Sequence, residues 1–129
     1  MTDLIPHEHA ISPCIVAAPD FTSDEVVIHA ASLLKEHEHE LTESILAYAH
    51  QHAIELLPAS HVEVLPEQGR LGRVNGKICV LGKQELLMKA GIDISFLAHE
   101  TEILRERQMK PYLLSIGDHL AGLIAVPNR

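Results

Sequence analysis

The strongest local signal in the chain is Gly69-Arg-Leu-Gly-Arg-Val-Asn-Gly-Lys-Ile-Cys-Val-Leu-Gly-Lys-Gln-Glu-Leu-Leu-Met88. Two apolar-rich segments, 70–74 and 77–81, flank Asn75-Gly76, a dipeptide that readily adopts the positive φ angles of a tight hairpin turn. Gly82 then ends the second segment, and the following residues are typical of a short helix. The sequence therefore predicts a β-hairpin that leads directly into a helix.

The rest of the chain alternates between helical and strand patterns. Upstream of the hairpin, the predicted elements are a strand over 10–17, helices over 23–35 and 40–52, and a strand over 61–65. Downstream, they are helices over 83–90 and 95–109 and a strand pair over 111–116 and 119–126. Ser23 and Ser95 are the predicted N-caps of their helices, and Gly91 is predicted to stop the helix before it.

This order of elements predicts the α+β class, as an antiparallel β-sheet flanked by helical hairpins. A length of 129 residues is enough for one domain with a sizeable core. We expect residues 1–22 to form an N-terminal strand region and residues 23–126 to form the core of this single domain.

Composition and charge exclude several classes of function. The net charge of −8, with only two tyrosines, two phenylalanines and no tryptophan, opposes nucleic-acid binding. No run of about 18 apolar residues is present, so we expect no direct membrane insertion. The N-terminus lacks the basic and apolar regions of a signal peptide, and the two cysteines suggest no disulfide framework. A cytoplasmic protein, monomeric in isolation, is expected.

Ten histidines is a high count for this length, and six of them form His-x-His pairs: His7/His9, His37/His39 and His50/His52. One interpretation is a metal site, and the other is solvated polar positions. Side chains two positions apart on a helix point about 200° away from each other, which opposes chelation by His50 and His52. The second pair lies at the break between two helices, where a loop can direct an imidazole into a cleft. Both interpretations of that pair stay open.

The order of helix, histidine junction, helix, strand and glycine-punctuated hairpin is similar to the nucleotide-binding (N) domain of heavy-metal transporting P-type ATPases. The resemblance covers roughly residues 23–126. In that family the junction reads Ser-Glu-His-Pro and its histidine contacts adenine; here it reads His37-Glu38-His39-Glu40. The resemblance implies that His39 contacts the base and that Glu38 lies beside it.

A second part of the resemblance is the glycine loop. The family's Gly-x-Gly corresponds to Glu67-Gln68-Gly69, followed here by Gly72, and glycines allow the backbone to approach a nucleotide closely. Further along, Gly82-Lys83 stands where the family has a glycine and an asparagine. The resemblance thus adds four residues to the expected nucleotide site: Gly69, Gly72, Gly82 and Lys83.

Four positions depart from the family pattern. A glutamate that accepts from the adenine amino group is Leu34 here, which we still expect in the pocket lining. Glu40 replaces a proline, Glu67 replaces the first loop glycine, and Lys83 replaces an asparagine. The lysine suits a phosphate, whereas the other changes weaken binding. ATP binding weaker than in a standard relative is therefore expected.

The resemblance implies a domain that positions Mg-ATP for phosphorylation of an aspartate in a separate phosphorylation domain of a P-type ATPase. The Asp-Lys-Thr-Gly-Thr motif that carries this aspartate is missing, so we expect no activity from this chain alone and no catalytic residue. The alternative hypothesis is an N-domain-like protein that has lost nucleotide binding and acts as a regulatory or protein-interaction module. A third hypothesis is a metal buffer that uses the His-x-His pairs.

Overall fold

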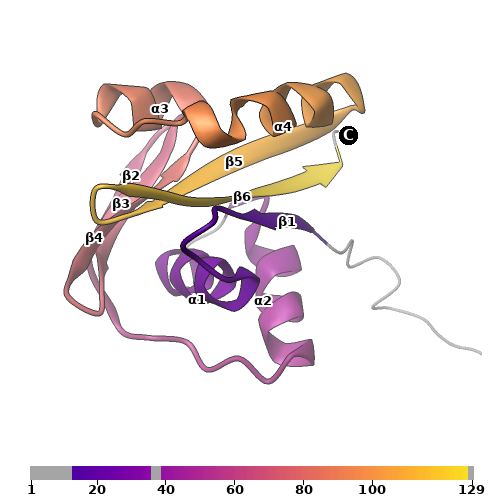
Figure 1. Ribbon diagram of the computed structural model, residues 1–129. Coiled ribbons are helices and arrows are strands. Elements are labelled where there is room, and N and C mark those ends of the chain that lie inside the picture. The colour runs from indigo at the N-terminus through magenta and orange to yellow at the C-terminus, as the bar shows by residue number, and fades with distance from the viewer. Residues whose placement is uncertain (1–12, 36–38, 128–129) are drawn as a thin grey trace, which may run out of the picture.

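The computed structural model describes residues 13–35 and 39–127 (Figure 1). The elements run in the order β1 (Cys14–Ala17), α1 (Ser23–Leu34), α2 (Thr42–Gln51), β2 (Ala59–Leu65), β3 (Gly69–Val74), β4 (Lys77–Gly82), α3 (Gln84–Lys89), α4 (Ser95–Glu106), β5 (Met109–Ile116) and β6 (His119–Pro127). The predicted order of helices and strands is confirmed.

The strands form one six-stranded sheet in the order β1-β6-β5-β4-β3-β2, and every neighbouring pair is antiparallel. The central hairpin has the predicted register, with Val74 opposite Lys77 and Gly69 opposite Gly82. Asn75 and Gly76 both have positive φ, at 54° and 82°, as a tight turn with the right-handed twist of a hairpin requires. The antiparallel sheet predicted from the pattern is therefore confirmed.

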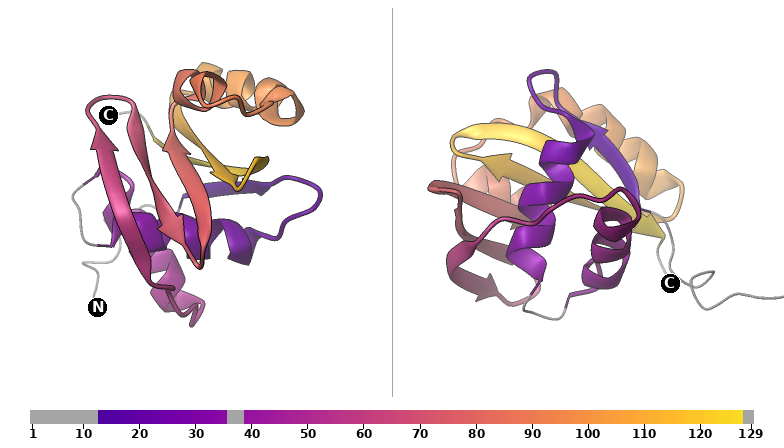
Figure 2. Two further views of the ribbon diagram at one scale, coloured as in Figure 1. Left: turned by 90° about the vertical axis from the view of Figure 1, so that its left-hand side faces the viewer. Right: turned by 90° about the horizontal axis from the view of Figure 1, so that it is seen from below.

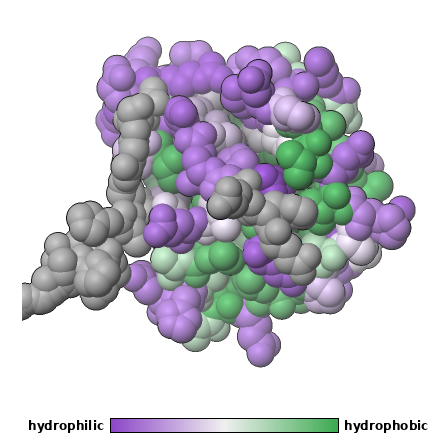
Figure 3. Space-filling view, turned by 180° about the vertical axis from the view of Figure 1, so that it is seen from behind, coloured by the Kyte–Doolittle hydropathy of each residue, from purple (hydrophilic) through white to green (hydrophobic). Residues whose placement is uncertain are grey.

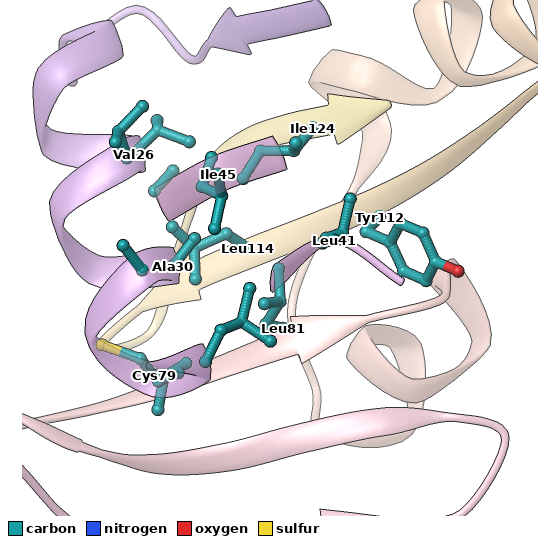
Figure 4. Packing of buried hydrophobic residues seen from close by; sticks show 14 of the residues in the cluster. Val26, Ala30, Leu41, Ile45, Cys79, Leu81, Tyr112, Leu114 and Ile124 are labelled. Atoms are coloured by element: carbon teal, nitrogen blue, oxygen red, sulfur yellow. The ribbon is translucent and has the colours of Figure 1, made fainter. Parts of the chain in front are cut away.

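Two layers of helices cover this sheet. Helices α1 and α2 pack on one face and α3 and α4 on the other, as the views from the side and from below show (Figure 2). Each pair has its own apolar cluster; the larger one, under α1 and α2, includes Val26, Ala30, Ile45, Leu81 and Leu114 (Figure 4). Seen from behind, the outer surface over α3 and α4 is mostly hydrophilic (Figure 3). Burial of these clusters drives the helices onto the sheet.

The N-caps of two helices differ from the predictions. Thr22, not Ser23, caps α1, because its side chain accepts from the Glu25 N–H while the Glu25 carboxylate accepts from the Thr22 N–H. This reciprocal capping box satisfies two backbone donors that a serine one position later would leave open.

Helix α4 was predicted to be capped by Ser95 and to run to Met109. Its N-cap is Ile94, and the Asp93 carboxylate accepts the Ser95 N–H at 3.0 Å. The helix ends at Glu106, because Gln108 has a φ of 65° and the chain turns into β5 there. Met109 is thus the first residue of a strand.

The N-terminal strand begins at Cys14, and the part of its prediction over residues 10–12 lies outside the described residues. Across residues 13–35 and 39–127, none of the helices has the length and apolar character needed to cross a bilayer.

Candidate functional site

A hollow of about 370 Å³ opens where the N-terminal end of α2 meets one end of the sheet. Its walls come from the residues before α2, the end of β2, the start of β3, the residue before α3, and β5. The lining residues are His39, Glu40, Val64, Leu65, Glu67, Gln68, Gly69, Arg70, Lys83 and Tyr112. We call this space the first hollow.

The imidazole of His39 is held in one orientation. Its Nδ1 accepts the Leu41 backbone N–H at 3.0 Å, and its carbonyl accepts the Thr42 N–H at 3.0 Å. Leu41 is fully buried, so this anchor belongs to the core. Since Nδ1 accepts, the proton of the neutral ring resides on Nε2.

The ring also meets Tyr112 edge-on, with centroids 5.0 Å apart and planes at 73°, a favoured aromatic geometry. The Tyr112 hydroxyl points away from the apolar cluster, past Leu41 (Figure 4).

The surroundings of His39 favour the neutral form of its imidazole. Burial lowers the pKa of the imidazole below its ordinary value, the nearby Arg70 guanidinium lowers it further, and Glu40 opposes both effects. A neutral, half-buried ring with Nε2–H as a donor is suited to lie against a flat, uncharged base.

The loop between β2 and β3 lies close over the start of α3. The Gln68 carbonyl accepts the Lys83 N–H at 2.9 Å, and the Gln68 N–H donates to the Leu65 carbonyl at 3.0 Å. Gly69 has a φ of 147°, and a Cβ there would overlap the Leu81 carbonyl. The absence of a side chain at this glycine is what allows the loop to pack so closely.

Comparisons with known proteins identify the fold. Copper-transporting ATPase 1 of Rhizobium meliloti is 36% identical over 114 residues, which cover 88% of this chain and 14% of the relative. The zinc-exporting P-type ATPase of Mycobacterium marinum is 27% identical over 117 residues, which cover 90% of this chain and 16% of the relative. No protein-family model matches the chain.

Two solved structures share the architecture. The crystal structure of the N-domain of HMA8, a copper-transporting P-type ATPase, aligns with a TM-score of 0.74 at 18% identity, over 90% of this chain and 98% of that one. The crystal structure of a zinc-transporting PIB-type ATPase aligns with a TM-score of 0.75 at 18% identity, over 92% of this chain and 19% of that one. The chain has the fold of a heavy-metal P-type ATPase N-domain. The chain spans only 14% of the length of the first curated relatives it matches.

The structure brings together three of the residues expected at the nucleotide site of this N-domain. His39, Gly69 and Lys83 all line the first hollow, although they come from three separate segments of the chain. Glu38 lies outside the described residues, as do His7, His9 and His37.

Three other expected site residues of this N-domain lie away from the walls of the first hollow. Leu34 is completely buried in the core, because the last turn of α1 packs on the sheet, and it does not line the first hollow. A Cβ on Gly72 would meet Leu33 and Val62, which places this glycine beneath α1. Gly82 lies beneath the loop, facing Gln68 and Gly69, where it supports the wall without lining it.

Arg70 was missed as a site residue. Its side chain is 2% exposed, it lines the first hollow, and burial lowers the pKa of its guanidinium. A signal was available in the sequence, since strand alternation puts Arg70 on the same buried face as Gly72 and Val74. A charged residue at such a position indicates a special environment.

Glu40 was expected to weaken the site, and its contacts were not foreseen. Its carboxylate accepts a hydrogen bond from the Tyr112 hydroxyl, and its other oxygen lies 3.3 Å from the Lys110 Nζ. These contacts tie the residues before α2 to β5 and fix one wall of the first hollow.

The histidine pairs show no chelating arrangement in the part of the N-domain that the structure describes, where no group of three or more His, Cys, Asp or Glu side chains is placed to hold a metal ion. His52 stacks on Tyr48, with centroids 4.0 Å apart and planes at 17°. Metal binding by His7/His9 or His37 stays a prediction, because these residues lie outside the described ranges.

Proposed function

We propose that this N-domain binds ATP in the first hollow and positions it for phosphorylation of an aspartate in a separate phosphorylation domain. The observation that carries the proposal is the convergence of His39, Gly69 and Lys83 on one hollow of about 370 Å³. A fixed imidazole ring and an ammonium group supply partners for a base and a phosphate, and the glycine lets the loop that forms the wall pack close to β4.

Binding is weak in this proposal. Leu34 is buried and contributes no polar group, while Glu40 and Glu67 place two carboxylates on the walls. A dissociation constant near 1 mM corresponds to about −4 kcal/mol, which is enough for a site supplied by millimolar ATP. In the parent enzyme the ligand is Mg-ATP.

The rest of the parent protein completes the reaction. The proposed partner is the phosphorylation domain of a heavy-metal P-type ATPase, reached by rigid-body closure, with the N-domain on the cytoplasmic side of the membrane. Hydrolysis and cation transport belong to that whole enzyme in this proposal, and the N-domain supplies only the nucleotide.

The direct test is an amide NMR titration with ATP, with and without magnesium. Saturable shifts are expected at His39, Gly69 and Lys83. His39→Ala is expected to weaken binding, whereas His99→Ala, an exposed histidine on α4, serves as the matched control. Equal affinity in the two variants would reject His39 as the base contact.

A second function is favoured by Glu40 and Glu67, because two carboxylates beside the first hollow repel a polyphosphate. In that case the N-domain has lost its ligand and acts as a regulatory or protein-interaction module. A flat ATP titration to several millimolar, in a chain whose fold is intact by NMR, would support it over nucleotide binding.

A further inference from the structure

A second hollow of about 360 Å³ adjoins the first one. Its lining residues are Glu40, Lys83, Arg105, Met109, Lys110, Pro111 and Tyr112. Three of these, Glu40, Lys83 and Tyr112, also line the first hollow, so the two spaces share a wall and form neighbouring parts of one site.

The second hollow is cationic in a chain of net charge −8. Lys83, Arg105 and Lys110 face a single carboxylate, that of Glu40. This carboxylate already accepts the Tyr112 hydroxyl and lies 3.3 Å from the Lys110 Nζ, so its charge is partly satisfied inside the wall.

Arg105 retains capacity for a further anion. Its Nη1 lies 3.9 Å from the Glu102 carboxylate, at the limit of an ion pair, and the two side chains are 39% and 65% exposed. An exposed pair of this kind is weak, and a guanidinium offers five donors, so a multiply charged anion competes for it effectively.

The second hollow also lies at a defined end of the sheet. Met109, in its lining, pairs with Pro127 at the end of β6, and Cys14 at the start of β1 pairs with Ala125 nearby. The outer ends of β1 and β6 therefore lie at the same end of the molecule as the junction of α4 and β5 (Figure 1).

We propose that the second hollow is a polyphosphate subsite that selects nucleoside triphosphates over monophosphates. This inference rests on the proposed function: the base occupies the first hollow, and the phosphates pass Lys83 and Tyr112 to reach Arg105 and Lys110. The terminal phosphate then lies at the end of the domain where β1 begins and β6 ends.

The test uses the full chain and four probes: adenosine, AMP, ATP and inorganic tripolyphosphate, each followed by amide NMR. ATP is expected to bind roughly tenfold more tightly than AMP, since charge-assisted contacts add with each phosphate. Tripolyphosphate alone is expected to shift the signals of Lys83, Arg105 and Lys110.

Arg105→Gln supplies the decisive variant, because Arg105 lines the second hollow but not the first. It is expected to reduce the ratio of ATP to AMP affinity several-fold. Arg107→Gln is the matched control, with the same charge change on an exposed arginine that lines neither hollow. It is expected to keep the ratio of the parent chain.

The outcomes separate the two proposals. Amide NMR shifts with tripolyphosphate but none with adenosine would support the polyphosphate subsite and reject the base site of the proposed function. Equal affinities for ATP and AMP, or an equal effect of Arg105→Gln and Arg107→Gln, would overturn the subsite while leaving base binding intact. Competition by a poly-glutamate peptide as strong as that by tripolyphosphate would also overturn it, in favour of an acidic protein partner.

Discussion

The Tyr112 hydroxyl donates a hydrogen bond to the carboxylate of Glu40, a residue 72 positions earlier in the chain. The same tyrosine ring meets the edge of His39, so a single side chain of β5 orients two neighbouring residues before α2. Lys110 reinforces the contact from the same strand. This arrangement determines the shape of the wall that the two hollows share.

Removal of this hydroxyl tests the contact. Tyr112→Phe is expected to reduce the free energy of unfolding by about 1 kcal/mol, since the lost hydrogen bond is charge-assisted but its acceptor is partly exposed. Urea denaturation measures the change. Tyr48→Phe is the control; Tyr48 stacks on His52 through its ring, and a change below about 0.5 kcal/mol is expected. Equal effects in both variants would contradict the assigned role of the Tyr112 hydroxyl.

The protonation of His39 links stability to pH. Its pKa in the folded chain is lowered from 6.5, so the unfolded chain binds more protons just below pH 6.5. The contribution of this pKa shift to the free energy of unfolding is therefore complete above pH 6.5. It is lost as the pH falls through the lower pKa that His39 has in the folded chain.

His39→Gln is expected to flatten the fall in unfolding free energy between about pH 7 and 5, relative to the parent chain. Because the chain has ten histidines, the informative quantity is the difference between variant and parent in denaturation series at each pH. His99→Gln, on the exposed surface of α4, is expected to preserve the slope. A parallel curve for His39→Gln would show that His39 is not the linked group.

Glu67 combines an unfavourable backbone with an unfavourable charge. Its φ is 65°, in the left-handed region, and it lines the first hollow. Glu67→Gly is expected to increase ATP affinity about threefold to tenfold, by removing a carboxylate near the ligand and relaxing the turn. Glu67→Gln removes the charge and keeps the backbone, so calorimetry or NMR on both variants separates the two causes. Unchanged affinity in both would place the ligand away from this loop.

Gly69 is expected to tolerate no side chain. Gly69→Ala is predicted to reduce stability by about 2–4 kcal/mol, because its Cβ would overlap the Leu81 carbonyl at a φ of 147°. Gly76→Ala is the control, since its φ of 82° is also positive but nothing lies within 4 Å of the new Cβ. About 1 kcal/mol is expected there. Thermal or urea unfolding of the two variants checks the difference, and equal losses would refute the close approach.

Local signals in the sequence predicted most of the fold. The turn at Asn75-Gly76 was correct because the φ preferences of these two residues act within a few bonds. The predictions of the helix caps were less accurate. Thr22 and Ser23 are both good N-cap residues, and only the reciprocal hydrogen bonds with Glu25 select Thr22.

The candidate site was predicted in part. His39, Gly69 and Lys83 converge as expected, whereas Leu34 turns into the core. The sequence places Leu34 on a helix, but the packing angle of α1 on the sheet decides which side of its last turn is buried. Gly72 lies under α1 for the same reason.

By itself, then, the sequence determined the order of strands and helices and the central turn at Asn75-Gly76. These features depend on the conformational preferences of single residues and on apolar periodicity. The tertiary structure alone decided that Glu40 meets Tyr112 and Lys110, that Arg70 lines the same hollow as His39, and that a second cationic hollow adjoins the first. These contacts join strands and loops far apart in sequence, and such partners are selected by the packing of the whole sheet and its helices.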